Sequence, residues 1–377
     1  MDRYNYDNRR VTRRVRCGGV AIGGGSPVSV QSMTNTDTRD IPATVAQIES
    51  LAEAGCDIVR LAVPDMAAAD ALADIRAELS ARGIRVPLVA DIHFDHRLAI
   101  AAIERGADKI RINPGNIGSK EKVLAVVERA RDAGIPIRVG VNSGSLERDL
   151  AEKFCDNAAE ALCESALRNI ELVAAAGFED IVASVKSSDV RTGISALRLL
   201  SERTDFPLHV GVTEAGAGDR ALAKSAIGIG ALLADGIGDT IRVSLTGDPV
   251  SEVRAAHDIL ASLGMLGGAI DVISCPTCGR CRVDLPRLAG EVREAVLAIE
   301  RKTIAAAWRG NALTVAVMGC AVNGPGEASH ADIGVACGDG NAVLFENGAK
   351  LTTLAEGEIV PALMERIRAK LAKGAGE

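Results

Sequence analysis

Five cysteines near the end of the chain have the type and spacing to bind a metal: Cys275, Cys278, Cys281, Cys320 and Cys337. Thiolate sulfur is a ligand for zinc and for iron–sulfur clusters. Zinc ribbons use paired C-x-x-C knuckles, and Cys320 has no such partner, so zinc would need an irregular ligand set. Iron–sulfur clusters accept irregular spacing. We therefore favour an iron–sulfur cluster and keep a structural zinc ion as the alternative.

A carboxylate follows Cys320 closely in the sequence. Glu327 belongs to the turn-rich stretch Ala321–Ala328. Carboxylate oxygen is a harder and more exchangeable ligand to iron than thiolate. A cluster held by three cysteines and Glu327 would have one iron whose fourth coordination position can be given up to a substrate. Glu327 would then have a catalytic role. Cys281 is the alternative fourth ligand, and four thiolates would close the cluster to substrate.

Polar residues gather at the carboxyl ends of the strands that the first 265 residues predict. They are Gln31, Ser32, Arg60, Asp91, His93, Arg111, Asn113, Arg138, Asn142, Ser184, Lys186, Thr213, Glu214, Arg242 and Ser244. Several cations at one rim repel one another unless an anion lies among them, and guanidinium groups fit phosphate oxygens. The pattern predicts a phosphorylated ligand. Among the histidines, we expect His93 to be functional, His209 to be structural, His96 to be a solvated helix start, and His257 and His330 to lie at the surface.

Eight short apolar runs, each followed by a segment with helical spacing, predict repeated βα units. The runs are Val28–Ser32, Asp57–Leu61, Leu88–Asp91, Lys109–Ile112, Pro136–Val141, Asp180–Ser184, Leu208–Val212 and Thr240–Val243. Eight such units close most naturally into a (β/α)8 TIM barrel, and the polar strand ends favour a barrel over a doubly wound open sheet. The segment before the first strand predicts a hairpin at the barrel entrance. Cys17, Cys56, Cys155 and Cys163 are expected in the barrel core.

The residues after the glycine-rich linker near 264–268 predict a smaller α/β domain, so we assign residues 1–265 to the barrel and 270–377 to the second domain. The expected elements are a strand into Cys275, a helix over 285–308, three strands and a closing helix. The expected strands are Leu313–Met318, Ile333–Ala336 and Ala342–Glu346, and the closing helix is Ile359–Leu371.

Composition excludes several classes of protein. The chain of 377 residues is 47% hydrophobic and 25% charged, with a formal net charge of −7, which is typical of a globular protein. One Trp, two Tyr and five Phe leave little material for stacking on bases, so we expect no nucleic-acid partner. No apolar stretch reaches the ~18 residues that a membrane helix needs. Nine cysteines without a signal segment predict a reducing compartment, the cytoplasm.

Six sequence blocks resemble the 4-hydroxy-3-methylbut-2-en-1-yl diphosphate synthase family, iron–sulfur enzymes of the non-mevalonate isoprenoid pathway. They are Val30–Thr36, Ala90–Asp95, Ile110–Gly118, Arg138–Ser145, Ser274–Arg280 and Val317–Glu327. The resemblance implies a TIM barrel followed by a 4Fe-4S domain. It also implies reductive opening of 2-C-methyl-D-erythritol 2,4-cyclodiphosphate to the allylic diphosphate, with two electrons from flavodoxin or ferredoxin, in a homodimer.

The resemblance also assigns residues to these roles. It implies that Cys275, Cys278, Cys320 and Glu327 hold the cluster. The positions that match the family around the diphosphate are Arg60, His93, Arg111, Asn113, Arg138, Asn142, Lys186 and Ser244. We add Asp91 and Thr213 from the same rim to the substrate-binding set, and we expect Glu214 and His93 to deliver protons to the departing oxygen.

Two other functions fit parts of the sequence. A barrel lyase or aldolase could use Lys186 as a Schiff base, with zinc stabilising the second domain. An electron carrier would use the cluster alone, but it would have no evident use for a cationic barrel rim.

Overall fold

The computed structural model describes residues 9–266, 269–299 and 312–374, and it divides into two compact units, Met1–Ile259 and Leu260–Glu377. Each unit is described by itself. No described helix combines the length and the apolar character that crossing a membrane requires.

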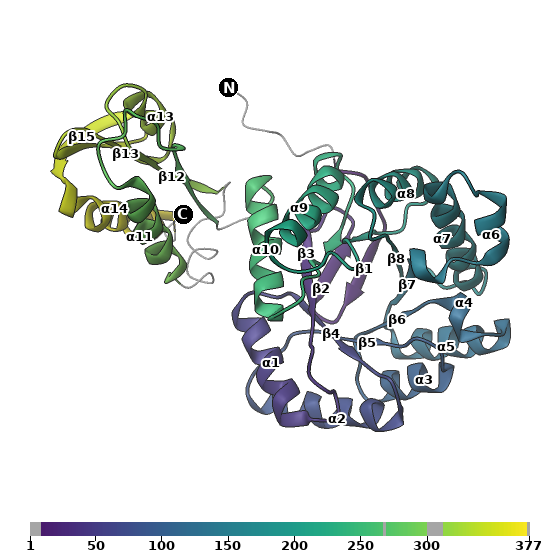
Figure 1. Cartoon of the computed structure of the whole chain (residues 1–377). Helices are drawn as coiled ribbons and strands as arrows, with labels where there is room; N and C mark the ends of the chain where they lie inside the picture. Colours follow the sequence, from purple (N-terminus) through teal and green to yellow (C-terminus); the bar gives the residue numbers. More distant parts are fainter. Residues whose placement is uncertain (1–8, 267–268, 300–311, 375–377) are drawn as a thin grey trace. The chain divides into compact units, whose positions relative to one another are not determined.

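The first unit is an eight-stranded parallel barrel (Figure 1). Its strands are β3 (Ser29–Met33), β4 (Ile58–Ala62), β5 (Leu88–Asp91), β6 (Lys109–Ile112), β7 (Ile137–Asn142), β8 (Ile181–Lys186), β9 (His209–Val210) and β10 (Thr240–Ile241). They pair in the order β8-β7-β6-β5-β4-β3-β10-β9, and a parallel bridge between Ala183 and Leu208 joins β8 to the segment before β9. The sheet therefore closes on itself, which confirms the predicted barrel and excludes the open sheet.

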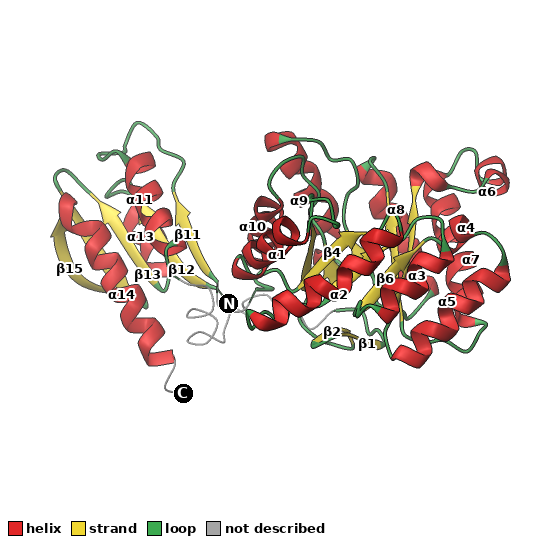
Figure 2. Cartoon of the chain, turned by 90° about the horizontal axis from the view of Figure 1, so that it is seen from below, coloured by secondary structure: helices red, strands yellow, loops and turns green. Residues whose placement is uncertain are grey.

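Ten helices of the first unit surround these strands among the described residues (Figures 1 and 2). They are α1 (Ile41–Glu53), α2 (Met66–Ala81), α3 (His96–Glu104), α4 (Pro114–Ile117), α5 (Lys120–Ala133), α6 (Arg148–Lys153), α7 (Ala158–Ala174), α8 (Val190–Arg203), α9 (Gly218–Ala234) and α10 (Pro249–Ser262). Aspartates begin several of them. Asp40, Asp65 and Asp189 each accept a hydrogen bond from a backbone N–H of the first turn, which satisfies a donor that the helix cannot.

A hairpin closes the amino-terminal end of the barrel. The antiparallel strands β1 (Arg14–Cys17) and β2 (Val20–Gly23) form it, as predicted. Val15, Cys17 and Ile22 pack there in one buried cluster with Ile58, Val89 and Val182 of the barrel strands. This apolar end leaves the opposite rim, at the carboxyl ends of the strands, as the polar face.

Two expectations for single residues of the first unit are wrong. Cys155 is exposed, because it lies in the turn between α6 and α7 and not in a helix that faces the core. His257 is buried, because it shares a face of α10 with the buried residues Val253 and Leu260, at helical spacing. Cys17, Cys56 and Cys163 are buried as predicted, and so is His209.

The second unit is a five-stranded sheet with helices on it (Figure 2). Its elements are β11 (Ile270–Ser274), α11 (Leu285–Leu297), β12 (Leu313–Met318), α13 (Gly324–His330), β13 (Ile333–Cys337), β14 (Asn341–Glu346), β15 (Ala349–Ala355) and α14 (Ile359–Gly374). The strands follow one another in the sheet, the first three parallel and the last two antiparallel. Helices α11 and α14 pack on one apolar face, and Ala328 and Ala331 pack in a second cluster with β12 and β13.

Three expectations for the second unit need adjustment. The stretch after Cys320 forms the short helix α13 and is not only a loop, since Pro325 occupies one of its first positions. The strand β15 was not predicted. The helix expected over 285–308 is shorter: α11 ends at Leu297 with Ala298 as its C-cap, and residues 300–308 lie outside the described part of the chain.

Candidate functional site

The polar rim of the barrel is built around one buried carboxylate. Asp91, at the end of β5, is 5% exposed and lies 3.2 Å from Arg111 and 3.9 Å from Arg60. Burial raises the pKa of this carboxyl, but the charges of Arg60, Arg111 and Arg138 outweigh burial and hold its pKa at about 2. Asp91 is therefore an ionised partner for two arginines and carries no proton near neutral pH.

Two further cations of the rim lack a carboxylate partner among the described residues. Arg138 is 1% exposed, and its Nη1 donates to the Ser184 hydroxyl at 2.8 Å, while its Nε and Nη2 have no hydrogen-bond partner there. Lys186 is 7% exposed at the end of β8. Burial, and then the neighbouring arginines, lower the pKa values of both groups well below their usual range. An anion entering this rim would relieve the repulsion between them.

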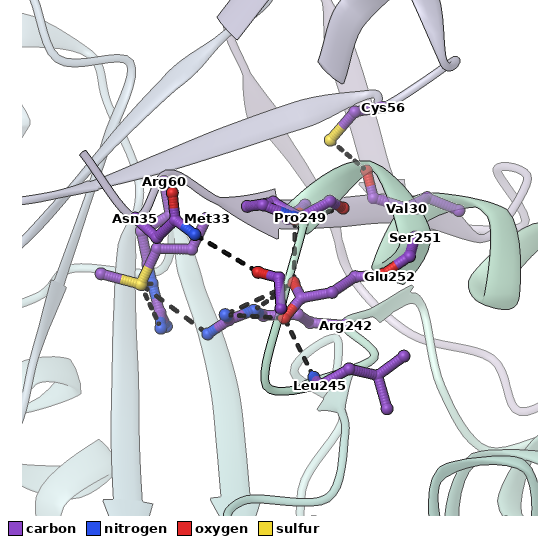
Figure 3. Close-up of polar contacts among 12 residues, drawn as sticks. Val30, Met33, Asn35, Cys56, Arg60, Arg242, Leu245, Pro249, Ser251 and Glu252 are labelled. Carbon is purple, nitrogen blue, oxygen red and sulfur yellow. Dashed lines mark hydrogen bonds and ion pairs between the residues drawn. The ribbon is translucent and has the colours of Figure 1, made fainter. Parts of the chain in front are cut away.

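A second buried carboxylate holds the arginine that follows β10 (Figure 3). Glu252, from α10, lies 3.4 Å from the Arg242 guanidinium and accepts hydrogen bonds from the Ser32 hydroxyl at 2.9 Å and the Leu245 N–H at 3.0 Å. Its side chain is 5% exposed. The Met33 sulfur lies close to Arg242 and also to Arg60. Sequence reasoning did not select Glu252 or Met33, which the barrel closure brings to the rim.

The predicted proton donors lie at more exposed positions. His93 follows β5, with its Nε2 3.4 Å from Arg111 Nη1, and it lines a pocket of about 300 Å³ together with Asp91, Phe94 and Leu98. Glu214 is exposed after β9, with a left-handed backbone (φ 52°). Thr213 and Ser244 follow β9 and β10 at the same end of the barrel. The structure thus brings His93 to the charged rim, and it places Glu214 in a loop at that end.

A hydrogen-bond network fixes the loop that carries Asn113. The Asn113 amide donates to the Ser145 hydroxyl, which in turn donates to the Asn142 carbonyl. Asn169 of α7 accepts the Gly115 N–H at 2.9 Å and donates to Glu147 at 3.1 Å. Asn169 is 3% exposed, so this contact is well shielded from water. Asn169 and Glu147 were not predicted, because neither lies at a strand end.

In the second unit, the thiols collect at the carboxyl ends of two neighbouring parallel strands. Cys275 directly follows β11, and Cys320 follows β12. The backbone N–H groups of Val322, Asn323 and Gly324 hydrogen-bond the Cys320 sulfur and lower the pKa of its thiol. Hydrogen bonds from the Arg280 backbone and side chain lower the pKa of Cys278. Both sulfurs lie in surroundings that favour the thiolate, the form that binds metal.

Cys281 and Cys337 lie in different surroundings. Cys281 packs against the main apolar cluster of this unit and donates from its sulfur to the Val283 carbonyl at 3.3 Å. A Cβ on Gly319 would stand 2.4 Å from the Cys281 sulfur, so the two are in close contact. Cys337 is fully buried, and burial raises the pKa of its thiol to about 12. Cys337 is therefore a core residue, and Cys281 is a half-buried residue packed against the core.

The remaining predicted ligand, Glu327, is exposed in the first turn of α13. Across the part of the chain that the structure describes, no three His, Cys, Asp or Glu side chains converge closely enough to hold a single metal ion. A four-iron cube is larger than one ion, and its ligands approach separate corners from separate loops. Cys275, Cys278 and Cys320 lie on two loops that follow the adjacent strands β11 and β12.

Two family models match the chain, one within each of its two units. A family model described as the GcpE TIM-barrel domain matches residues 12–257, and one described as the GcpE protein C-terminal domain matches residues 271–369. The chain belongs to the GcpE family. The cationic rim therefore falls in the barrel domain of a GcpE protein, and the thiols at the ends of β11 and β12 fall in its C-terminal domain.

Curated GcpE relatives match over nearly the whole chain. The chain is 52% identical over 360 residues to the 4-hydroxy-3-methylbut-2-en-1-yl diphosphate synthase (flavodoxin) of Clostridium perfringens, covering 96% of this chain and 99% of the relative. It is 50% identical over 362 residues to the protein of the same name from Geobacter sulfurreducens, covering 96% and 98%. A solved structure of Plasmodium falciparum HPPK-DHPS A437G with SDX-DHP has a TM-score of 0.50 at 11% identity, covering 68% of this chain and 51% of that one, and it shows the barrel fold alone.

Proposed function

We propose that this protein opens 2-C-methyl-D-erythritol 2,4-cyclodiphosphate reductively to 4-hydroxy-3-methylbut-2-enyl diphosphate, expelling a hydroxyl as water. In this proposal, residues 1–265 bind the cyclodiphosphate and residues 270–377 hold a 4Fe-4S cluster. The names of the curated relatives support the reaction. The observation that carries it is a barrel rim whose buried cations outnumber its carboxylates.

The rim supports diphosphate binding through its unbalanced charge. Arg60 and Arg111 share Asp91, whereas Arg138 and Lys186 have no carboxylate partner among the described residues. A diphosphate would supply the missing negative charge and accept the unused N–H groups of Arg138. We assign Arg60, Arg111, Arg138 and Lys186 to its oxygens, and Asp91, His93, Asn113, Asn142, Thr213 and Ser244 to the walls around the substrate.

The C-terminal domain supports a cluster held by Cys275, Cys278, Cys320 and Glu327. The backbone N–H groups of Asn323, Val322 and Gly324 lower the pKa of the Cys320 thiol, which favours the thiolate that a cluster needs. Cys281 is the competitor for the fourth position. It packs on the apolar core, as Cys275 also does, but its thiol already donates to the Val283 carbonyl, which gives it a structural role. Exposed Glu327 is free of such packing. When bound, the cluster would supply electrons one at a time for C–O bond cleavage.

The protein groups hold the substrate and move its protons. Fixed guanidinium groups at the rim would keep the diphosphate, and with it the reacting carbon, in one orientation. Loss of a hydroxyl as water requires a proton at the departing oxygen. Asp91 is unsuited to provide it, because its pKa of about 2 keeps it ionised. Glu214 and His93 are the candidates, and both are exposed where a substrate oxygen can reach them.

The partners follow from the same reaction. The reductant is flavodoxin or ferredoxin, and the names of the curated relatives support flavodoxin. We further propose a homodimer in the cytoplasm, where a reducing environment suits the nine free cysteines.

An anaerobic assay tests the reaction. The reconstituted holoprotein is mixed with the cyclodiphosphate and a strong one-electron donor, and the allylic diphosphate is measured by mass spectrometry. We expect product from the wild type and from Cys155→Ser, which changes an exposed thiol of the barrel unit. Cys320→Ser should lose cluster and product together. A loaded wild-type protein that leaves the cyclodiphosphate intact would refute the proposed function.

A further inference from the structure

A methionine sulfur lies between two of the rim arginines. The Met33 Sδ is 3.1 Å from Nε and 2.9 Å from Nη2 of Arg60, and 3.7 Å from Nη1 of Arg242. Figure 3 shows the sulfur facing both guanidinium groups, one from β4 and one from the end of β10. The Met33 side chain is half-buried at the end of β3, the strand that separates them in the sheet.

Each of these two arginines has its own carboxylate partner, separate from the Met33 sulfur. Arg60 pairs with Asp91 at 3.9 Å, and Arg242 pairs with Glu252 at 3.4 Å. Both arginine side chains are largely buried, with exposed fractions of 11% and 15%. The neighbour that the two guanidinium groups share is therefore the uncharged Met33 sulfur and not a carboxylate.

A thioether at that point has two physical consequences. It is a weak hydrogen-bond acceptor, so it can orient two N–H groups without cancelling their charge. A carboxylate in the same place would neutralise one arginine and repel a phosphate. Because contacts to the sulfur are weak, a phosphate oxygen can replace them at little cost, whereas a charge-assisted bond would have to be broken first.

We infer that Met33 is a positioning residue that holds Arg60 and Arg242 as a pair and gives way to the diphosphate. This inference rests on the proposed substrate class and adds Arg242 to the arginines that bind the diphosphate oxygens. In the free protein the sulfur keeps the two guanidinium groups directed at one point. In the complex the phosphate oxygens take over those N–H groups, so Met33 affects binding and not the chemical step.

Three variants separate this role from simple packing. Met33→Leu keeps the volume and removes the acceptor, Met33→Gln restores an uncharged acceptor, and Met66→Leu is the control on the exposed first residue of α2. We expect Met33→Leu to raise KM about threefold, a loss of about 0.6 kcal/mol of binding, with kcat unchanged. Met33→Gln should recover most of that loss, and Met66→Leu should match the wild type.

A binding experiment with inorganic pyrophosphate keeps this test separate from the reaction. Calorimetry on the full chain should show weaker pyrophosphate binding for Met33→Leu and near-normal binding for Met33→Gln. The methyl resonance of isotope-labelled Met33 should also shift when pyrophosphate binds. Equal pyrophosphate affinity in the wild type and Met33→Leu, or a Gln variant no better than Leu, would overturn the inference. Pyrophosphate binding with these differences but no turnover of the cyclodiphosphate would leave it standing and refute the proposed reaction.

Discussion

Replacing Glu252 by Gln removes one buried charge from the rim and almost no volume. The carboxylate has three kinds of partner: the Ser32 hydroxyl, the Leu245 N–H and the Arg242 guanidinium. The hydroxyl can turn and accept from the new amide, and the amide oxygen can still accept the Leu245 N–H. The cost therefore falls mainly on Arg242, which is left without its counter-charge.

The size of this cost follows from burial. Breaking a buried ion pair by removing one partner costs about 3–5 kcal/mol. The separation of 3.4 Å is long and the Arg242 side chain is 15% exposed, so we expect the lower end, about 3 kcal/mol. For a unit of this size, that loss lowers the melting temperature by roughly 6–12 °C. The uncompensated arginine should at the same time bind an anion more tightly.

Calorimetric melting of the full chain, with and without inorganic pyrophosphate, measures both effects. The Glu252→Gln barrel should melt lower than the wild type, and pyrophosphate should raise its melting temperature by more than it raises the wild type's. Glu128→Gln, on the exposed face of α5, is the matched control and should melt like the wild type. The reasoning fails if Glu252→Gln melts within about 2 °C of the wild type, less than 1 kcal/mol, or if pyrophosphate stabilises both proteins equally.

Three further changes have defined outcomes. The pKa of Asp91 is about 2 in the folded protein and about 3.9 in the unfolded chain, so its ionised form adds about 2–3 kcal/mol to the free energy of unfolding above pH 4, and this is lost as the pH falls toward 2. In acid unfolding followed by circular dichroism, the stability of Asp91→Asn should therefore fall less steeply with pH than that of the wild type. The same pH dependence in both proteins would count against the ion pairs. Gly319→Ala should displace the Cys281 sulfur, which stands 2.4 Å from the added Cβ, and lower the melting temperature of the second unit, whereas unchanged melting would contradict the close contact. Asn169→Leu should free the Asn113 loop from Glu147 and raise KM about tenfold, about the value of one buried hydrogen bond, while an unchanged KM would show that the loop holds its place without Asn169.

The barrel strands could be predicted because each is a short apolar run in which both faces are buried. All eight predicted runs overlap the strands of the structure. The strand β15 could not be found in this way. Most residues of Ala349–Ala355 are exposed at the edge of the second sheet, so they carry no apolar pattern. Helix α13 was hidden for another reason, since its Gly-Pro-Gly start is typical of a turn.

The charged residues of the site could be predicted, and the residues that hold them could not. Arg60 and Arg111 lie within three residues of the carboxyl ends of β4 and β6, where barrel enzymes place functional groups, whereas Arg138 lies near the start of β7. Met33 carries no sequence signal for this role, because a methionine at a strand end usually packs in the core. Glu252 lies in a helix more than 200 residues along the chain from its partner Ser32, and only closure of the barrel joins them.

The identity of the fourth cluster ligand is the central claim of the mechanism. The measurement that tests it most directly compares iron, acid-labile sulfide and turnover in anaerobically reconstituted Cys281→Ser and Glu327→Ala. We expect Cys281→Ser to keep its cluster and its activity, and Glu327→Ala to lose turnover, with a depleted or altered cluster. Loss of the cluster in Cys281→Ser alone, with Glu327→Ala fully loaded and active, would contradict the assignment of Glu327.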